Sequence, residues 1–292
     1  MFVILGGILI YAFVRISSLT EDVSLITTEL ASTTAALSQN TSHLAQNITD
    51  LRTQTTGLSD TLSSTQDNIA TVNTKVGGVL QTVGSISGTV GTLQKLSQID
   101  PELLKKYSKV YFMNENYVPA RLVSIPKEYL YTETVPEHFL ADAWPFLRKL
   151  ADAAKADGIT LYVSSAFRSF GEQQSLKSSY TVVYGAGTAN SFSADQGYSE
   201  HQLGTTVDFI TTGLGGKLDG FDGTATYSWL LANAHRFGFV LSYPKDNSYY
   251  IYEPWHWRFV GTKLAAYLHD NKLNFYDLDQ RAIDDYLINI FD

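Results

Sequence analysis

Cysteine is absent from the 292-residue chain. This absence excludes disulfide bonds and thiolate metal ligands, which leaves histidine, aspartate and glutamate as the side chains able to hold a metal ion. A cysteine-free chain is compatible with a location outside the cytoplasm, although it does not establish one.

Basic residues are also scarce. The chain has 21 Lys and Arg residues against 29 Asp and Glu residues, which gives a formal net charge of −8. Surfaces that bind nucleic acid carry an excess of positive charge. The composition therefore argues against a nucleic-acid partner.

Aromatic residues are missing from the first third of the chain. None lies between Phe13 and Tyr107, and 34 of the 37 aromatic residues lie from Tyr107 onward. Aromatic side chains contribute much of the apolar surface of packed cores, so we expect the folded domain to comprise residues 98–292. Residues 20–97 are instead rich in Thr, Ser, Asn and Gln and poor in charge, which sets them apart as a separate segment.

The first 14 residues, MFVILGGILIYAFV, form a continuous apolar run. As a helix they would span about 20 Å, less than the roughly 30 Å hydrocarbon core of a membrane. The run lacks a basic region before it and a small-residue cleavage site after it, which disfavours a signal peptide. We expect residues 1–19 to form a membrane anchor, its short length being explained by a start further upstream. The alternative is a buried or interfacial helix, and Arg15 argues weakly against an external C-terminus.

A seven-residue repeat runs through residues 23–93. One column of the repeat is apolar at ten of eleven positions, and a second column, four residues later, is β-branched almost throughout. Leucine in one column and β-branched residues in the other are typical of a coiled-coil seam. The first column is Val23, Leu30, Leu37, Leu44, Leu51, Leu58, Thr65, Val72, Val79, Ile86 and Leu93, and the second is Thr27, Thr34, Thr41, Ile48, Thr55, Leu62, Ile69, Val76, Val83 and Val90.

We therefore interpret residues 20–97 as a helical coiled-coil stalk through which chains self-associate. A fully helical stalk would reach about 105 Å at 1.5 Å per residue. The threonines in the seam and the glycines near its end weaken this interpretation, since glycine costs about 1 kcal/mol against alanine in a helix. The alternative is a flexible Ser/Thr-rich linker, and in either case the segment is a spacer.

The C-terminal part mixes helices and strands without a regular strand–helix–strand rhythm, so we predict an α+β domain. The expected helices cover residues 136–156, 171–184, 225–237, 261–271 and 279–290, and the expected strands cover residues 159–166, 207–210, 239–242, 249–252 and 257–259.

Two short stretches of this domain carry candidate metal ligands. In SEHQLGTTVDF, Gly204 would turn a loop into a strand and bring His201 and Asp208 together. In YEPWHWR, Pro254 excludes a helix interior, so we expect Glu253 and His256 to lie three residues apart on an extended hook. Two histidines and one carboxylate, His201, His256 and Asp208, would fill three positions of a tetrahedral zinc site and leave the fourth for water. Zinc lowers the pKa of that water to about 7, and a carboxylate that does not bind the metal, Glu253, would then serve as general base.

An ordinary structural role is the alternative for each histidine. His201 with Asp208 could be part of a hydrogen-bonded core, and the spacing alone leaves this open. The other four histidines, His43, His138, His235 and His269, are interpreted as structural or surface residues, because one lies in the stalk and three lie in or beside expected helices.

Three motifs in order resemble the zinc D-alanyl-D-alanine carboxypeptidases of the vancomycin-resistance type, within the larger group that includes lysostaphin-like peptidases and the hedgehog signalling domain. The similarity spans about 100 residues, and we expect it to extend over the whole domain from about residue 100. The matching residues are Ser165, Arg168, Ser169 and Gln173, then Ser199, His201, Gly204 and Asp208, then Glu253, Pro254, Trp255 and His256.

The resemblance implies a hedgehog/D-Ala-D-Ala metallopeptidase-like fold and assigns roles to these residues. His201, Asp208 and His256 would ligate one Zn²⁺ ion, and Glu253 would be the base. Arg168 would stabilise the oxyanion of the tetrahedral intermediate. The alternative is that Arg168 forms an ion pair with a structural role only. The substrate or its terminal carboxylate would be bound by Ser165, Gln173 and Ser199.

The motifs also depart from the family pattern at positions that are not ligands. Thr206 stands where a small residue is usual, Ala166 and Phe167 replace glycine and tyrosine, and Asp195-Gln196 replace a basic residue and proline. These departures put the fine substrate preference in doubt.

The resemblance implies a domain that removes the C-terminal D-alanine from peptidoglycan stem peptides. Together with the apolar N-terminal run, it leads us to expect a single-pass membrane protein whose catalytic domain is extracytoplasmic. Alternatives within the fold are an L,D-carboxypeptidase or a peptidoglycan endopeptidase. A different class of alternative is a membrane-tethered protein that binds the cell wall without cutting it, although such a protein would be expected to have lost a ligand or the base.

Overall fold

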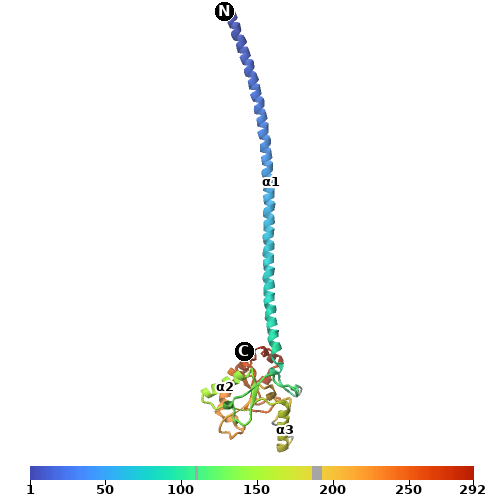
Figure 1. The fold of residues 1–292 in the computed structure, drawn as a ribbon, viewed down its shortest axis with the longest axis vertical. Helices are drawn as coiled ribbons and strands as arrows, with labels where there is room; N and C mark the ends of the chain where they lie inside the picture. The colour runs from blue at the N-terminus through green and yellow to red at the C-terminus, as the bar shows by residue number, and fades with distance from the viewer. Residues whose placement is uncertain (109–110, 186–192) are drawn as a thin grey trace. The chain divides into compact units, whose positions relative to one another are not determined.

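In this computed structural model, residues 1–108, 111–185 and 193–292 are described. The chain divides into a unit of residues 1–87 and a unit of residues 88–292, and Figure 1 traces its course.

The first unit is helical throughout. Helix α1 (Phe2–Gln98) runs without a break, and none of its 97 residues is buried. Many of its threonines donate a side-chain hydrogen bond to the carbonyl four residues earlier, as Thr34 does to Leu30 (2.7 Å). These bonds give the hydroxyls partners within the helix, so the Thr side chains need no partner elsewhere in the chain. The expected long helix is thus present, while the coiled coil stays a prediction.

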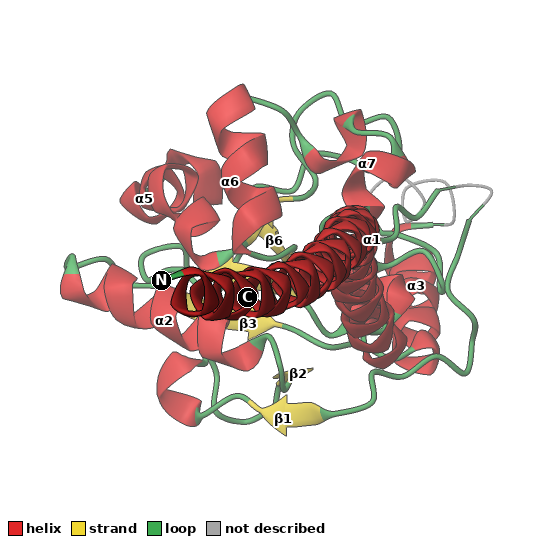
Figure 2. Cartoon of the chain, turned by 90° about the horizontal axis from the view of Figure 1, so that it is seen from above, coloured by secondary structure: helices red, strands yellow, loops and turns green. Residues whose placement is uncertain are grey.

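The second unit is the α+β domain, and its centre is a four-stranded antiparallel sheet in the order β3-β4-β6-β5. Its strands are β3 (Tyr162–Ser165), β4 (Thr206–Ile210), β5 (Phe239–Leu241) and β6 (His256–Phe259). A separate two-stranded sheet pairs β1 (Leu122–Ser124) with β2 (His138–Leu140). In Figure 2 this small sheet lies at the opposite side of the domain from α5 and α6.

Helices pack around the central sheet and enclose its core. They are α2 (Trp144–Ala156), α3 (Phe170–Tyr184), α5 (Ala225–Asn233), α6 (Thr262–Asn271) and α7 (Gln280–Asp284). The rings of Phe139, Phe209, Phe239 and Phe259 meet between the sheets, with adjacent centroids 5.5–6.5 Å apart. This aromatic cluster packs β2 against the strands of the central sheet that carry the candidate site.

The structure corrects several expected elements. The helix expected over residues 136–156 begins only at Trp144, because residues 138–140 pair with β1 instead. Residues 249–252 are not a strand, and the helix expected over 279–290 is split into α7 and the 3₁₀ turn η7 (Leu287–Asn289). Residues 138–140 form a strand because they pair with β1. A short apolar run in the sequence does not by itself predict this pairing.

Candidate active site

Strand register brings two candidate ligands together. Across the central sheet, Asp208 on β4 lies directly opposite His256 on β6 and beside Ser165 on β3. Residues opposite one another in an antiparallel pair project to the same face. The pairing of β4 with β6 therefore brings Asp208 and His256 together, although they are 48 residues apart in the sequence.

The third candidate ligand arrives from a turn. His201 lies in the 3₁₀ helix η3 (Glu200–Leu203), which ends at Gly204 in a left-handed conformation (φ 70°) before β4 begins. A Cβ at this position would meet Leu122 Cδ2 at 3.0 Å and Pro119 Cγ at 3.1 Å. Glycine is thus required both by the backbone angle and by close packing, and the expected turn at Gly204 is present.

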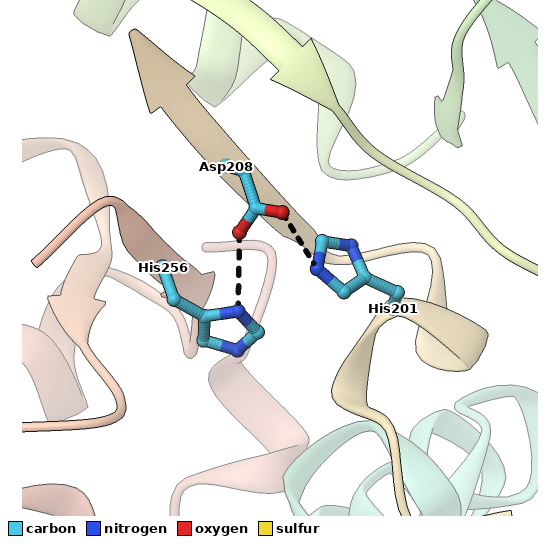
Figure 3. Close-up of side chains that lie close together, drawn as sticks. All are labelled: His201, Asp208 and His256. Atoms are coloured by element: carbon cyan, nitrogen blue, oxygen red, sulfur yellow. Dashed lines mark hydrogen bonds and ion pairs between the residues drawn. The ribbon is translucent and has the colours of Figure 1, made fainter. Parts of the chain in front are cut away.

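The three side chains converge on one point (Figure 3). One oxygen of Asp208 lies 3.2 Å from His201 Nε2 and the other lies 3.3 Å from His256 Nδ1. One ligand atom from each residue can be chosen so that all lie within 4.8 Å of one another. All three residues are buried, so this group has the composition and spacing of a metal site.

The electrostatics of the group follow from burial and hydrogen bonding. Burial lowers the pKa of His201. Although burial opposes ionisation of Asp208, its charge interactions and hydrogen bonds with His201 and His256 hold the pKa of that carboxyl well below its ordinary value. Burial would lower the pKa of His256, but hydrogen bonds to Asp208 and Glu200 raise it to about 9. The group is therefore arranged around a permanent negative charge, as a cation site requires.

Glu253 lies beside His201, Asp208 and His256 but is not one of the three grouped candidate ligands. Its Oε2 is 3.6 Å from His256 Nδ1, and the backbone N–H of His256 donates to Glu253 O (3.1 Å) across the Pro254-Trp255 turn. The expected extended hook is in fact this turn. Burial, with a smaller contribution from the nearby Asp208 charge, raises the pKa of Glu253 to about 7, which suits a group that exchanges protons near neutral pH.

The polar residues named from the first motif also meet at the site. Arg168 donates from Nη1 to Gln173 Oε1 (2.7 Å) and from Nη2 to Ser165 Oγ (2.9 Å). Gln173 in turn donates to Ala194 O (2.8 Å). Arg168, Gln173 and Ser199 line one cleft with the histidines, Asp208 and Glu253, and its volume is about 1090 Å³. The guanidinium is thus held at the edge of the cleft by neighbours that fix its orientation.

Three further residues of the site were missed by sequence reasoning. Glu200 is fully buried and contacts His256, while Arg258 and Tyr276 both donate to Glu200. A signal was present for Arg258, because a charged residue two positions after His256 in an otherwise apolar strand must share the buried face of His256. Tyr276 had no such signal, since only the tertiary fold brings it there.

The sequence of the chain is similar to those of known carboxypeptidases. The profile of the D-alanyl-D-alanine carboxypeptidase family VanY matches residues 138–262. The chain is 34% identical over 180 residues to YodJ of Bacillus subtilis (strain 168), covering 60% of this chain and 66% of YodJ. It is 35% identical over 141 residues to a D-alanyl-D-alanine carboxypeptidase of Enterococcus faecalis, covering 44% of this chain and 51% of that enzyme. The chain thus spans about half to two thirds of the length of these relatives.

Solved structures share the fold of the domain. The LD-carboxypeptidase LdcB aligns with a TM-score of 0.56 and 33% identity, covering 61% of this chain and 85% of LdcB. A mutant of the vancomycin-resistance D,D-pentapeptidase VanY in complex with Zn(II) aligns with a TM-score of 0.50 and 27% identity, covering 60% of this chain and 97% of that one. The fold and site thus define a metallopeptidase domain. The chain belongs to the D-Ala-D-Ala metallopeptidase family, which confirms the resemblance identified from the three motifs.

Proposed function

We propose that the protein is a zinc-dependent D-alanyl-D-alanine carboxypeptidase that removes the C-terminal D-alanine from peptidoglycan stem peptides. The observation that carries the proposal is the convergence of His201, Asp208 and His256 beside the buried carboxyl of Glu253, in one cleft with Arg168. The family supports the reaction class, and the zinc complex of VanY supports the metal.

The donor set fits zinc. Two imidazoles and one carboxylate are the ligand types that catalytic zinc sites use, with a position left open for water or substrate. Bound in this group, zinc would act as a Lewis acid that polarises a carbonyl and makes water nucleophilic near neutral pH. His201, Asp208 and His256 would hold the ion, because their ligand atoms are already grouped.

Glu253 would move the proton. Its carboxyl lies within 3.6 Å of a ligand nitrogen and lines the cleft, so it can reach a water or an amine at the reacting centre. As a carboxylate it accepts the proton that the attacking water loses. It then donates that proton to the nitrogen of the departing D-alanine, which leaves as a neutral amine.

Arg168 and its neighbours would position the substrate. A fixed guanidinium in a partly buried cleft stabilises negative charge as it develops on the carbonyl oxygen. Gln173 and Ser165 hold the Arg168 guanidinium in place. Ser199, which is buried and lines the same cleft, would contact the substrate or its terminal carboxylate.

The proposal is tested with the full chain in detergent solution. We expect the zinc-loaded protein to release D-alanine from a stem pentapeptide, and we expect removal of zinc with a chelator to abolish the release reversibly. Absence of D-alanine release from the fully zinc-loaded protein would contradict the proposal.

A second activity, L,D-carboxypeptidase cleavage of a tetrapeptide, is favoured by one observation. The LD-carboxypeptidase LdcB aligns with a TM-score of 0.56, against 0.50 for VanY. Product masses from pentapeptide, tetrapeptide and cross-linked substrates separate the two carboxypeptidase activities from an endopeptidase. A protein that binds all three without cutting any would be the non-catalytic alternative.

We further propose that residues 1–19 anchor the chain in the cell membrane, that residues 20–97 form the stalk, and that the enzyme domain (98–292) lies outside the cytoplasm. Helix α1 contains, near the N-terminus, a window apolar enough to cross a membrane by length and composition, with mean hydropathy 2.1. A carboxypeptidase that acts on the cell wall must reach its substrate across a distance, and a long helix can act as the spacer. Cell fractionation with protease accessibility tests this placement.

The stalk would self-associate along its heptad seam. Its apolar columns are solvent-exposed, as Leu37, Leu51 and Val79 illustrate at 61% each. In a heptad frame that places the β-branched column at a and the leucine column at d, every acidic residue of the stalk occupies an outer b, c or f position. These residues are Glu21, Asp22, Glu29, Asp50, Asp60 and Asp67. Sedimentation of the full chain in detergent should therefore show an oligomer, which Leu51→Asp dissociates; a wild-type monomer would contradict the seam.

A further inference from the structure

Glu200 is a buried carboxylate with three hydrogen-bonding partners. Its Oε2 lies 3.1 Å from His256 Nε2, and its Oε1 accepts from Arg258 Nη1 (2.7 Å) and from Tyr276 OH (2.7 Å). Glu200 and Arg258 are both fully buried. A buried carboxylate of this kind persists because its charge is paired and its oxygens are satisfied.

This arrangement determines which nitrogen of His256 keeps its hydrogen when a metal ion binds. A carboxylate only accepts hydrogen bonds, so Nε2 of His256 must be the donor to Glu200. Nδ1 is then the nitrogen that faces Asp208, at 3.3 Å. His201 is arranged in the opposite sense, because its Nδ1 lies 2.6 Å from Ala166 O while its Nε2 faces Asp208 at 3.2 Å.

We propose that Glu200 is a positioning residue that fixes His256 with Nδ1 presented to the metal. The proposal rests on the proposed function only in taking His201, Asp208 and His256 as the ligands, and it deepens that assignment. Partners of metal-bound histidines set the ring orientation and the tautomer of the ligand, and their loss weakens metal binding.

Glu200 is itself anchored from both flanks of the segment that the family profile matches. Arg258 donates from Nη2 to Leu103 O (2.8 Å) and to Lys105 O (3.0 Å), and its guanidinium lies 4.5 Å from the centroid of the Phe275 ring. The profile covers residues 138–262, so Leu103, Lys105 and Tyr276 all lie outside it. The geometry of one metal ligand thus depends on chain segments before and after the family core.

NMR of the histidine ring nitrogens tests the proposal directly, because it shows which nitrogen carries hydrogen and which binds zinc. In the full chain labelled with ¹⁵N-histidine and loaded with zinc, NMR should show His256 protonated on Nε2 and bound through Nδ1, and His201 the reverse. A purely structural Glu200 would not impose this pattern. Finding Nδ1 of His256 protonated would overturn the proposal whatever the variants show.

Matched variants give the second test. A glutamine at 200 replaces one acceptor oxygen by an NH₂ group, so it cannot accept from His256, Arg258 and Tyr276 together. We expect Glu200→Gln to weaken zinc affinity about 10- to 100-fold in chelator competition. Glu253→Gln makes the same chemical change near the other nitrogen of His256 and should have a much smaller effect.

Two conservative Tyr→Phe substitutions provide a test if Glu200→Gln does not fold. Tyr276→Phe removes one donor to Glu200, whereas Tyr129→Phe removes a hydroxyl that bonds to Asp152 on the surface. Zinc affinity should fall in the first and not in the second. Equal affinities in both, or wild-type affinity in folded Glu200→Gln, would overturn the proposal.

The outcomes separate this inference from the proposed function. Zinc binding with the expected nitrogens but without D-alanine release leaves the positioning role standing and removes the carboxypeptidase. D-alanine release with unaltered zinc affinity in Glu200→Gln does the reverse.

Discussion

Helix α1 and the folded domain that follows it are stabilised by different means. Every hydrogen bond of Thr34 or Thr41 in the helix closes within one turn, and every side chain is solvent-accessible. In the domain, Asp208 contacts residues 7 and 48 positions away, and Glu200 contacts one 76 positions away. The same substitution should therefore have local consequences in the helix and wide consequences in the domain.

Loss of a carboxylate gives the largest expected contrast. Glu253→Gln removes the proposed proton carrier and should reduce D-alanine release about 10²- to 10⁴-fold. Glu29→Gln makes the same change on the exposed helix and should leave the rate unchanged. The turnover of both variants, each loaded with zinc, is compared with wild type; undiminished turnover in Glu253→Gln would exclude it as the base.

Loss of a guanidinium comes next. Arg168→Ala removes the proposed oxyanion partner and should lower kcat/KM about 10²- to 10³-fold. Arg52→Ala in the helix is the control and should match wild type. If Arg168 is only structural, its loss would lower the melting temperature and leave kcat/KM of the folded protein intact.

The effect of Leu→Ala on stability should differ between a buried leucine of the domain and an exposed leucine of the helix. Leu147 is 1% exposed in α2, whereas Leu25 in α1 is 65% exposed. Leu147→Ala should destabilise the domain by about 2–5 kcal/mol, and Leu25→Ala should not alter its unfolding. Tryptophan fluorescence reports the domain alone, since all four tryptophans lie beyond residue 143; equal midpoints in denaturant would contradict the burial.

Replacing glycine by alanine should change the stability in opposite directions in the two regions. Gly204→Ala places a Cβ at φ 70° against Leu122 and Pro119, and should cost about 1–3 kcal/mol. Gly57→Ala lies in open space within the helix and should stabilise it by about 0.5–1 kcal/mol. Thermal unfolding followed by fluorescence for the first and by far-ultraviolet circular dichroism for the second checks both, and a stabilising Gly204→Ala would show that the turn is not strained.

The two regions also differ in how much the sequence predicts. The helix could be read from its repeat, because periodicity is a local property. In the domain, His201, Asp208, His256 and Glu253 could be named because each motif is short and chemically distinctive. Strand β2 and the contact of Tyr276 with Glu200 could not be predicted, since the pairing of β2 with β1 and the burial of Tyr276 against Glu200 depend on contacts that no local pattern encodes.

Metal content tests the central claim most directly. The full chain, dialysed against zinc and analysed by atomic emission, should carry about one zinc ion per chain, and Asp208→Ala should carry almost none while remaining folded by fluorescence. Equal zinc content in the wild type and in folded Asp208→Ala, or none in either, would contradict the assignment of this group as the metal centre.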